Sequence, residues 1–234
     1  MEFTGRVVMI TGAAGTLGRA VAASFAAAGA NLVLVDIAAE GLEASFGKES
    51  AGRLPLVADL SDLAAIDGAV AQAMKKFGRI DVLCNVAGGF KMGPPVHETD
   101  DSLWRGMMDL NAGTVISMAH AVVPIMLAAG GGKIVNIGAM GGVVGKGNMA
   151  AYSAAKSAVI RLTESMGAEL REHGINVNCV LPSIIDTPPN RADMPDADPT
   201  RWVSPAALAD VILCLASDRA RAIHGASVPV VGLS

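Results

Sequence analysis

The sequence is poor in charged and aromatic side chains, and it lacks the patterns that mark several common protein classes. Of its 234 residues, 17% are charged and 3% are aromatic, whereas 52% are hydrophobic. Its net charge is −4 and no basic cluster occurs, which argues against nucleic acid or a membrane surface as a partner. No Ser/Pro/Gln tract, charge block or repeat divides it, so we predict one domain over residues 1–234.

Cysteine and histidine are few and lie far apart. The three cysteines stand in apolar contexts without the spacing of metal ligands, so we expect buried free thiols and a reducing, cytoplasmic setting. They are Cys84, Cys179 and Cys214. The four histidines have no carboxylate or cysteine at ligand spacing, so we predict no metal site.

No segment has the character of a membrane anchor. The N-terminal residues lack the layout of a signal peptide. The longest stretch without a charged residue, 110–132, contains Asn111, His120 and Pro124, which indicates a buried helix.

Short apolar runs alternate with longer helical patterns along the whole chain. The expected strands are Arg6–Ile10, Asn31–Val35, Leu54–Ala58, Ile80–Cys84, Lys133–Ile137, Ile175–Val180 and Ser227–Val231. The expected helices run from a glycine-rich turn to Ala28, over Asp62–Phe77 and Ser102–Ala129, from around Tyr152 to His173, and over Pro205–Ala216. The strands are nearly continuous apolar runs, as in parallel sheets covered on both faces. The sequence therefore predicts an α/β, Rossmann-type, doubly wound parallel sheet that binds ligands at the carboxyl ends of its strands.

A glycine-rich turn follows the first strand and opens a helix, in the segment Thr11-Gly-Ala-Ala-Gly-Thr-Leu-Gly18. Such a turn lets backbone N–H groups face a pyrophosphate. Asp36 ends the second strand, where a carboxylate accepts hydrogen bonds from ribose hydroxyls and repels a 2′-phosphate. We therefore predict a dinucleotide cofactor, with NAD(H) favoured over NADP(H).

Tyr152 and Lys156 lie four residues apart on a predicted helix, which places a phenol and an ammonium on one face. A cation beside a phenol favours the phenolate and lowers its pKa. A tyrosine tuned in this way can exchange a proton with a substrate near neutral pH.

Together these motifs resemble the short-chain dehydrogenase/reductase family over nearly the whole chain. Thr16 stands at the middle glycine of the family turn, Val86 replaces the second Asn of the Asn-Asn-Ala-Gly segment, and Ser183 replaces the usual glycine after Pro182. The resemblance implies a set of cofactor-binding residues: Gly12, Gly15, Thr16, Leu17, Gly18, Asp36, Asp59, Leu60, Asn85, Ala87, Gly88, Tyr152, Lys156, Pro182, Ser183, Ile185 and Thr187.

The resemblance also implies catalytic roles and an assembly. Tyr152 would be the general acid/base, Lys156 would hold the nicotinamide ribose and lower the tyrosine pKa, and Asn111 would support a proton relay. The family implies a homotetramer or homodimer packed through the helices that carry Asn111 and Tyr152. The segment 183–203 is expected to be a lid that closes over a small-molecule substrate and orders when the cofactor binds. Protease nicking there that is unchanged by NADH would count against this.

One departure from the family bears on the substrate. The family serine lies thirteen residues before the tyrosine, and this chain has Ala139 there. Dihydropteridine reductases, whose lid resembles 186–202, also have alanine at that position, so reduction of a quinonoid dihydropterin is one hypothesis. An ordinary 3-oxoacyl-type carbonyl reductase is a second, and a dinucleotide-binding sensor without catalysis is a third. Phe90 and Met140 are candidates for the wall of a substrate pocket, although packing explains such residues equally well.

Overall fold

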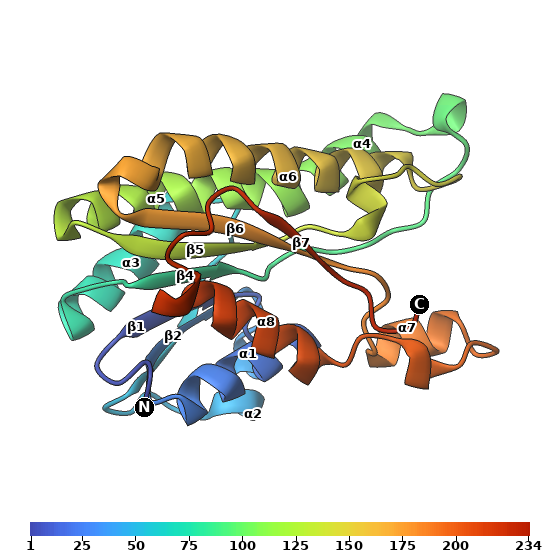
Figure 1. Ribbon diagram of the computed structural model, residues 1–234. Coiled ribbons are helices and arrows are strands. Elements are labelled where there is room, and N and C mark those ends of the chain that lie inside the picture. The colour runs from blue at the N-terminus through green and yellow to red at the C-terminus, as the bar shows by residue number, and fades with distance from the viewer.

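A single sheet of seven parallel strands runs through the centre of the molecule (Figure 1), in a computed structural model that describes residues 1–234. The strands lie in the order β3-β2-β1-β4-β5-β6-β7. They are β1 Val7–Thr11, β2 Asn31–Asp36, β3 Arg53–Val57, β4 Val82–Asn85, β5 Gly132–Ile137, β6 Ile175–Pro182 and β7 Ser227–Val230. The strand order reverses between β1 and β4, which is where such sheets bind ligands. The predicted doubly wound α/β fold is confirmed.

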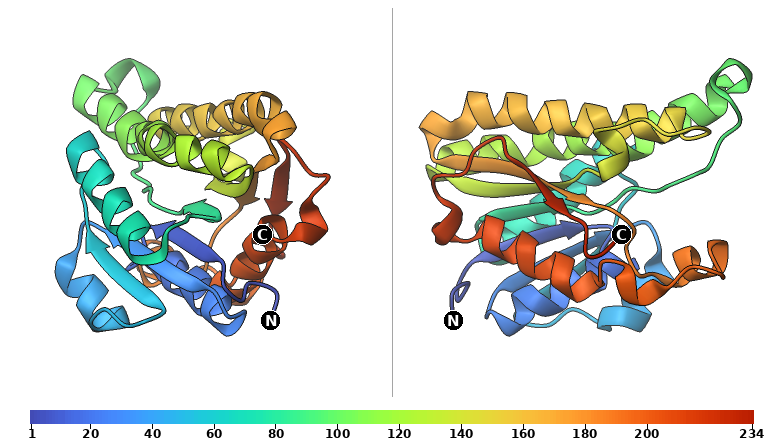
Figure 2. Two further views of the ribbon diagram at one scale, coloured as in Figure 1. Left: turned by 90° about the vertical axis from the view of Figure 1, so that its left-hand side faces the viewer. Right: turned by 45° about the vertical axis from the view of Figure 1, so that its right-hand side comes forward.

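Two layers of helices cover the sheet, with α3, α4, α5 and α6 on one face and α1, α2 and α8 on the other (Figures 1 and 2). The helices are α1 Thr16–Ala27, α2 Ala39–Phe46, α3 Leu63–Phe77, α4 Asp101–Met108, α5 Thr114–Ala129, α6 Ala150–Leu170, α7 Pro188–Asp193 and α8 Pro205–Ala216. Short helix α7 projects beyond the sheet on the side where the chain ends (Figure 1).

The central strands are mainly apolar because their residues pack into two cores, one on each face of the sheet. In β1, Val8 and Ile10 belong to the core under α1 and α8, whereas Val7 and Met9 belong to the core under α3 and α5. Successive strand residues point to opposite faces, so a strand covered on both sides needs apolar residues at every position.

All seven predicted strands are present, but their ends differ from the prediction by one or two residues. The most useful differences lie at the carboxyl ends. Thr11 pairs with Val35 and Asn85, and β2 continues to Asp36, so the polar residues that end the apolar runs are part of the sheet. Strand ends depend on hydrogen bonds between neighbours, which hydrophobicity alone does not reveal.

The predicted helix Ser102–Ala129 is present as one continuous helical segment over Asp101–Ala129, but its middle is not α-helical. A π-helical turn over Asp109–Gly113 separates α4 from α5. Within it the Asn111 amide donates to the carbonyl of Met107 at 3.0 Å, which satisfies a group that the wider turn releases. The turn thus directs Asn111 away from the regular helical ladder.

The prediction of a buried helix in this region is confirmed only in part. By length and composition alone, 101–129 could cross a membrane, with a mean hydropathy of 1.8 in its most apolar window. Only 33% of that window is buried, although Met118 and Met126 pack into the core. Ile116 is 54% exposed on the outer side of α5.

Three further expectations differ from the structure. Helix α2, between β2 and β3, is absent from the prediction. The lid segment 183–203 contains helix α7, which begins after Thr187. The Thr187 hydroxyl caps this helix by accepting from the N–H of Asn190, so a segment with the composition of a loop includes a helix. Cys84 and Cys179 are buried, but Cys214 is exposed because it lies on the outer face of α8. The cytoplasmic setting stays a prediction.

Candidate active site

The glycine-rich turn between β1 and α1 has a backbone that only glycine permits at two positions. Gly12 has a φ of +62°, and a Cβ there would lie 2.8 Å from the backbone of Ala87. A Cβ on Gly18 would lie 2.1 Å from the carbonyl oxygen of Gly12. The turn is therefore held tightly against the segment after β4, and α1 begins at Thr16 without a side-chain cap on its first N–H groups. Free N–H groups at a helix start are suited to bind a pyrophosphate.

The Thr11 hydroxyl joins this turn to the next strand of the sheet. It accepts from the N–H groups of Val86 and Ala87, at 3.1 Å each. The first and fourth strands therefore end in one connected structure at the switch point.

Asp36 lies at the edge of the same cleft and is fixed by two backbone groups. Its carboxylate accepts from the N–H of Ala14 at 2.9 Å and from the N–H of Ala38 at 3.0 Å. These contacts orient the carboxylate and leave it capacity to accept from ribose hydroxyls. The side chain of Ile37, the next residue, also lines the cleft and is exposed.

Asp59 and Leu60 line the cleft beyond Asp36, but the Asp59 carboxylate already accepts hydrogen bonds within the chain. This carboxylate accepts from the N–H and the hydroxyl of Ser61, and the backbone hydrogen bond from Ser61 lowers the pKa of Asp59 from its ordinary value. Leu60 presents an apolar surface that is suited to one side of an adenine ring.

Asn85 does not line the cleft, contrary to the prediction. Its side chain is buried and donates to Asn136 at 2.9 Å, and Asn136 donates to the Thr163 hydroxyl at 2.9 Å. This buried chain ties β4 to β5 and to α6. The cleft wall after β4 is instead formed by the residues that follow, which include Ala87 and Gly88.

Lys156 and Asn111 meet beside Gly88, which forms part of the cleft wall. Lys156 donates to the carbonyl of Ile137 at 2.8 Å. A Cβ on Gly88 would lie 2.9 Å from Asn111 Oδ1 and 3.3 Å from Lys156 Nζ, so both side chains face the same glycine. Tyr152 lies one turn before Lys156 on α6 and lines the cleft. The structure thus brings together the three predicted catalytic residues from two elements, helix α6 and the π-helical turn between α4 and α5.

The pKa values differ from the prediction. Burial raises the pKa of Tyr152 to about 12 and lowers the pKa of Lys156 to about 8. The expected lowering of the tyrosine pKa does not occur here, because desolvation acts on both groups and the Lys156 ammonium is directed to a backbone carbonyl. Tyr152 is therefore a neutral proton donor in this state of the protein.

The residues after β6 form the far side of the cleft, where the prediction placed Pro182, Ser183, Ile185 and Thr187. The Ser183 hydroxyl donates to the carbonyl of Val231 at 2.9 Å and lies 2.8 Å from the hydroxyl of Ser234. The segment after β7 therefore packs against this side of the cleft.

The cleft has a volume of about 1660 Å³ and includes residues that the sequence did not single out. Ala139 lies in its wall, as the motif position implied, and offers no hydroxyl. Phe90 lies against Tyr152, with ring centroids 4.9 Å apart and planes at 89°. Trp202 is buried and does not line the cleft. Sequence reasoning also missed apolar lining residues that carry no motif, namely Met92, Val144, Met149 and Met194, and polar ones that include Lys91, Lys146 and Asn190.

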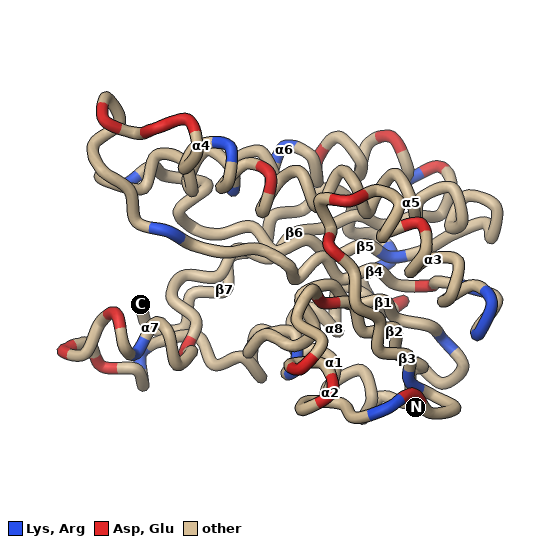
Figure 3. Tube along the Cα trace, turned by 180° about the vertical axis from the view of Figure 1, so that it is seen from behind, with Lys and Arg blue, Asp and Glu red and all other residues tan.

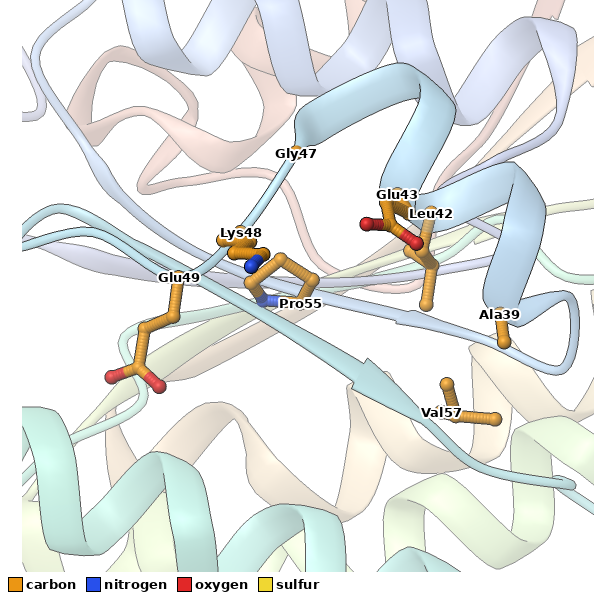
Figure 4. Close-up of a pocket in the computed structure, with 8 residues that line it drawn as sticks. All are labelled: Ala39, Leu42, Glu43, Gly47, Lys48, Glu49, Pro55 and Val57. Carbon is orange, nitrogen blue, oxygen red and sulfur yellow. The ribbon is translucent and has the colours of Figure 1, made fainter.

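A second, smaller pocket of about 240 Å³ lies between α2 and β3 (Figure 4). Lys48 lies over Pro55 there, whereas Glu49 points away from the hollow (Figure 4). None of the predicted site residues lines it. No group of three or more His, Cys, Asp or Glu side chains in the chain is arranged to hold a metal ion.

Comparison with known proteins agrees with this geometry. Residues 6–198 match the family model described as short chain dehydrogenase. The chain is 35% identical to levodione reductase of Leifsonia aquatica, over 99% of this chain and 94% of that one. It is 33% identical to a 3-oxoacyl-acyl-carrier-protein reductase of Thermotoga maritima, over 99% and 98% of the two chains.

Solved structures give the same result. The crystal structure of levodione reductase superposes with a TM-score of 0.89 at 34% identity, covering 98% of this chain and 97% of that one. NAD⁺-bound xylitol dehydrogenase superposes with a TM-score of 0.91 at 27% identity, covering 99% and 100% of the two chains.

Proposed function

The chain belongs to the short-chain dehydrogenase family of NAD(P)-dependent oxidoreductases, and from this premise we propose that it uses NAD(H) to interconvert a small carbonyl compound and its alcohol. The observation that supports the proposal is that Lys156 and Asn111 face Gly88, while Tyr152, one helical turn before Lys156, lines the same cleft that begins at the glycine-rich turn.

The residues present suit a dinucleotide. The space over Gly12 and Gly18 is closed to any Cβ, the first N–H groups of α1 are free of side-chain caps, and Asp36 is oriented at the rim. A bound nicotinamide supplies the hydride acceptor or donor for the substrate carbon. Tyr152 would exchange the proton with the substrate oxygen, since its hydroxyl lies in the cleft and makes no hydrogen bond within the chain. Lys156 would hold the nicotinamide ribose, and Asn111 would keep the backbone beside it in place.

We expect NADH to be favoured over NADPH. The Asp36 carboxylate repels a 2′-phosphate, and the exposed Ile37 beside it offers no cation to compensate. The discriminating measurement is NADH and NADPH oxidation side by side, with a panel of ketones and quinonoid dihydropterin as acceptors. We expect kcat/KM to be at least about tenfold higher with NADH. Equal rates, or faster oxidation of NADPH, would contradict the assignment of Asp36.

The substrate class can be tested with substitutions at Ala139. We expect Ala139→Ser to raise kcat/KM for simple ketones, by up to about a hundredfold, because a hydroxyl there supplies a second donor to the substrate oxygen. Ala139→Cys is the matched control, since a thiol has similar bulk but is a weak donor. A gain with both variants would assign the effect to shape and not to hydrogen bonding.

The same variant separates the remaining enzyme candidates. A large gain on 3-oxoacyl thioesters would favour a 3-oxoacyl-type reductase, the activity named for the Thermotoga maritima relative. Loss of turnover on quinonoid dihydropterin would favour a dihydropterin reductase, whose substrate needs no alcohol partner.

We also propose that the protein is a homotetramer or homodimer that buries the outer faces of α4, α5 and α6. Trp104 and Ile116 are exposed there, and α5 contains no Lys, Arg, Asp or Glu, so its trace is uncharged in Figure 3. Apolar faces of this kind are typical of subunit contacts. Sedimentation velocity checks the proposal, and a species at the single-chain mass of 23.7 kDa would contradict it.

A further inference from the structure

Phe90 lies at the point where the substrate must approach the proton donor. Its ring meets the ring of Tyr152 edge to face, with centroids 4.9 Å apart. Both residues line the cleft, Phe90 from the segment after β4 and Tyr152 from α6. Phe90 is 46% exposed, so its ring borders open space and is not part of the core.

The segment that carries Phe90 is held at both ends. The Asn111 side chain accepts from the N–H of Gly89 at 3.2 Å and donates to the carbonyl of Gly89 at 3.1 Å. A Cβ on Gly89 would lie 2.8 Å from Leu110, which packs directly behind it. At the other end, the N–H of Gly93 donates to the carbonyl of Asn148 at 2.8 Å. The Phe90 ring is therefore presented by a fixed backbone, and the same amide that faces the catalytic lysine sets its position.

Apolar side chains make up part of the cleft lining together with Phe90 and Tyr152, although Lys91, Lys146, Asn190 and Asp193 also line the cleft. Met140 and Val144 line it from the loop after β5, Met149 from the start of α6 and Met194 from the lid. Ala139 adds no hydroxyl. The Tyr152 hydroxyl is thus the proton donor for one substrate oxygen, and substrate hydroxyls that lie against the Phe90 ring and the methionine thioethers would be desolvated there.

We propose that Phe90 is the specificity-determining residue of this site, and that the site takes a compact, apolar, cyclic ketone or the corresponding secondary alcohol. One face of the substrate ring packs on the Phe90 side chain, and the carbonyl oxygen of the substrate is directed to the Tyr152 hydroxyl. Methionine side chains adapt to the remaining outline of the ring. This inference rests on the proposed oxidoreductase function, and it disfavours the polyhydroxylated substrates named for several relatives, such as sorbitol.

Three ketones of six carbons test the inference with the intact protein and NADH: cyclohexanone, 2-hexanone and fructose. For the native chain we expect kcat/KM to fall in that order, by at least about a hundredfold from first to last. Phe90→Ala is expected to raise KM for cyclohexanone about tenfold, with a smaller effect on 2-hexanone, because only the cyclic substrate packs its ring against the Phe90 side chain. KM for NADH should not change, and Phe90→Tyr, which keeps the ring, should retain the preference. The control is Val96→Ala, which truncates an exposed apolar side chain outside the cleft.

The outcomes separate this inference from the function on which it rests. Equal losses on all three ketones in Phe90→Ala would overturn it, since Phe90 would then only support Tyr152. Fructose turned over as well as cyclohexanone by the native chain would overturn it too. Turnover of other carbonyl compounds but not of cyclohexanone would overturn the substrate class and leave the oxidoreductase function intact. Failure to oxidise NADH or NADPH with every acceptor would overturn the proposed function itself.

Discussion

Replacing Tyr152 with phenylalanine is expected to lower kcat/KM by about 10²–10⁴-fold while leaving NADH binding and the fold intact. The reason is that the variant removes only the hydroxyl. That hydroxyl makes no hydrogen bond within the chain, and the aromatic ring keeps its edge-to-face contact with Phe90. Steady-state rates, measured together with NADH binding by fluorescence, check both parts. Turnover equal to that of the native chain would favour a dinucleotide-binding sensor over an enzyme.

The protonation state assumed for this step can be measured directly. Tyr152 is the only tyrosine in the chain, so its ionisation can be followed by ultraviolet absorbance. In the protein without cofactor we expect its pKa to be raised to about 12, because burial disfavours the phenolate. An ordinary value near 10 would mean that the hydroxyl is more hydrated than the cleft suggests.

Replacing Gly18 with valine is expected to abolish cofactor binding and to destabilise the protein. Even the Cβ would lie 2.1 Å from the Gly12 carbonyl oxygen and 2.7 Å from the Cα of Ala13, and these backbone atoms belong to the turn that receives the pyrophosphate. Relieving the overlap must open the turn, so we expect Kd for NADH to rise at least about tenfold and the free energy of unfolding to fall by about 1–3 kcal/mol. Calorimetric titration and chemical denaturation measure the two effects.

A matched glycine provides the control for that variant. Gly68 also lies inside a helix, α3, but a Cβ there would meet nothing within 4 Å. Gly68→Ala should therefore stabilise the protein by about 0.5–1 kcal/mol, because it restricts the unfolded chain without creating a clash. If Gly18→Val bound NADH as tightly as Gly68→Ala, the glycine-rich turn would not be the cofactor site.

Features that depend on local sequence were largely predictable. All seven strands were present near the expected positions, because a sheet covered on both faces requires unbroken apolar runs. Gly12, Gly18 and Asp36 could be placed because a tight turn and a strand-end carboxylate have few alternatives at that spacing. Tyr152 and Lys156 could be paired because helical periodicity alone puts them on one face.

Features that depend on neighbours distant in sequence were not predictable. Asn85 matches the family motif, but its side chain donates to Asn136 on the next strand and does not line the cleft. The helical pattern of the sequence continues through Asp109–Gly113. It therefore did not predict the π-helical turn from which Asn111 donates to the carbonyl of Gly89. The pKa of Tyr152 moved opposite to the expectation, because burial outweighed the nearby cation, and burial depends on how all the elements pack.

By itself, then, the sequence determined a parallel sheet with a dinucleotide turn at one end and a tyrosine–lysine pair on one helix, since glycine sterics, strand patterning and helical spacing act over a few residues. Only the tertiary structure decided what surrounds the proton donor. It brought Phe90 against Tyr152 and gathered methionines from separate loops around a position without a hydroxyl. A substrate pocket is the space left where several elements meet, and its shape depends on packing between residues that no local pattern connects.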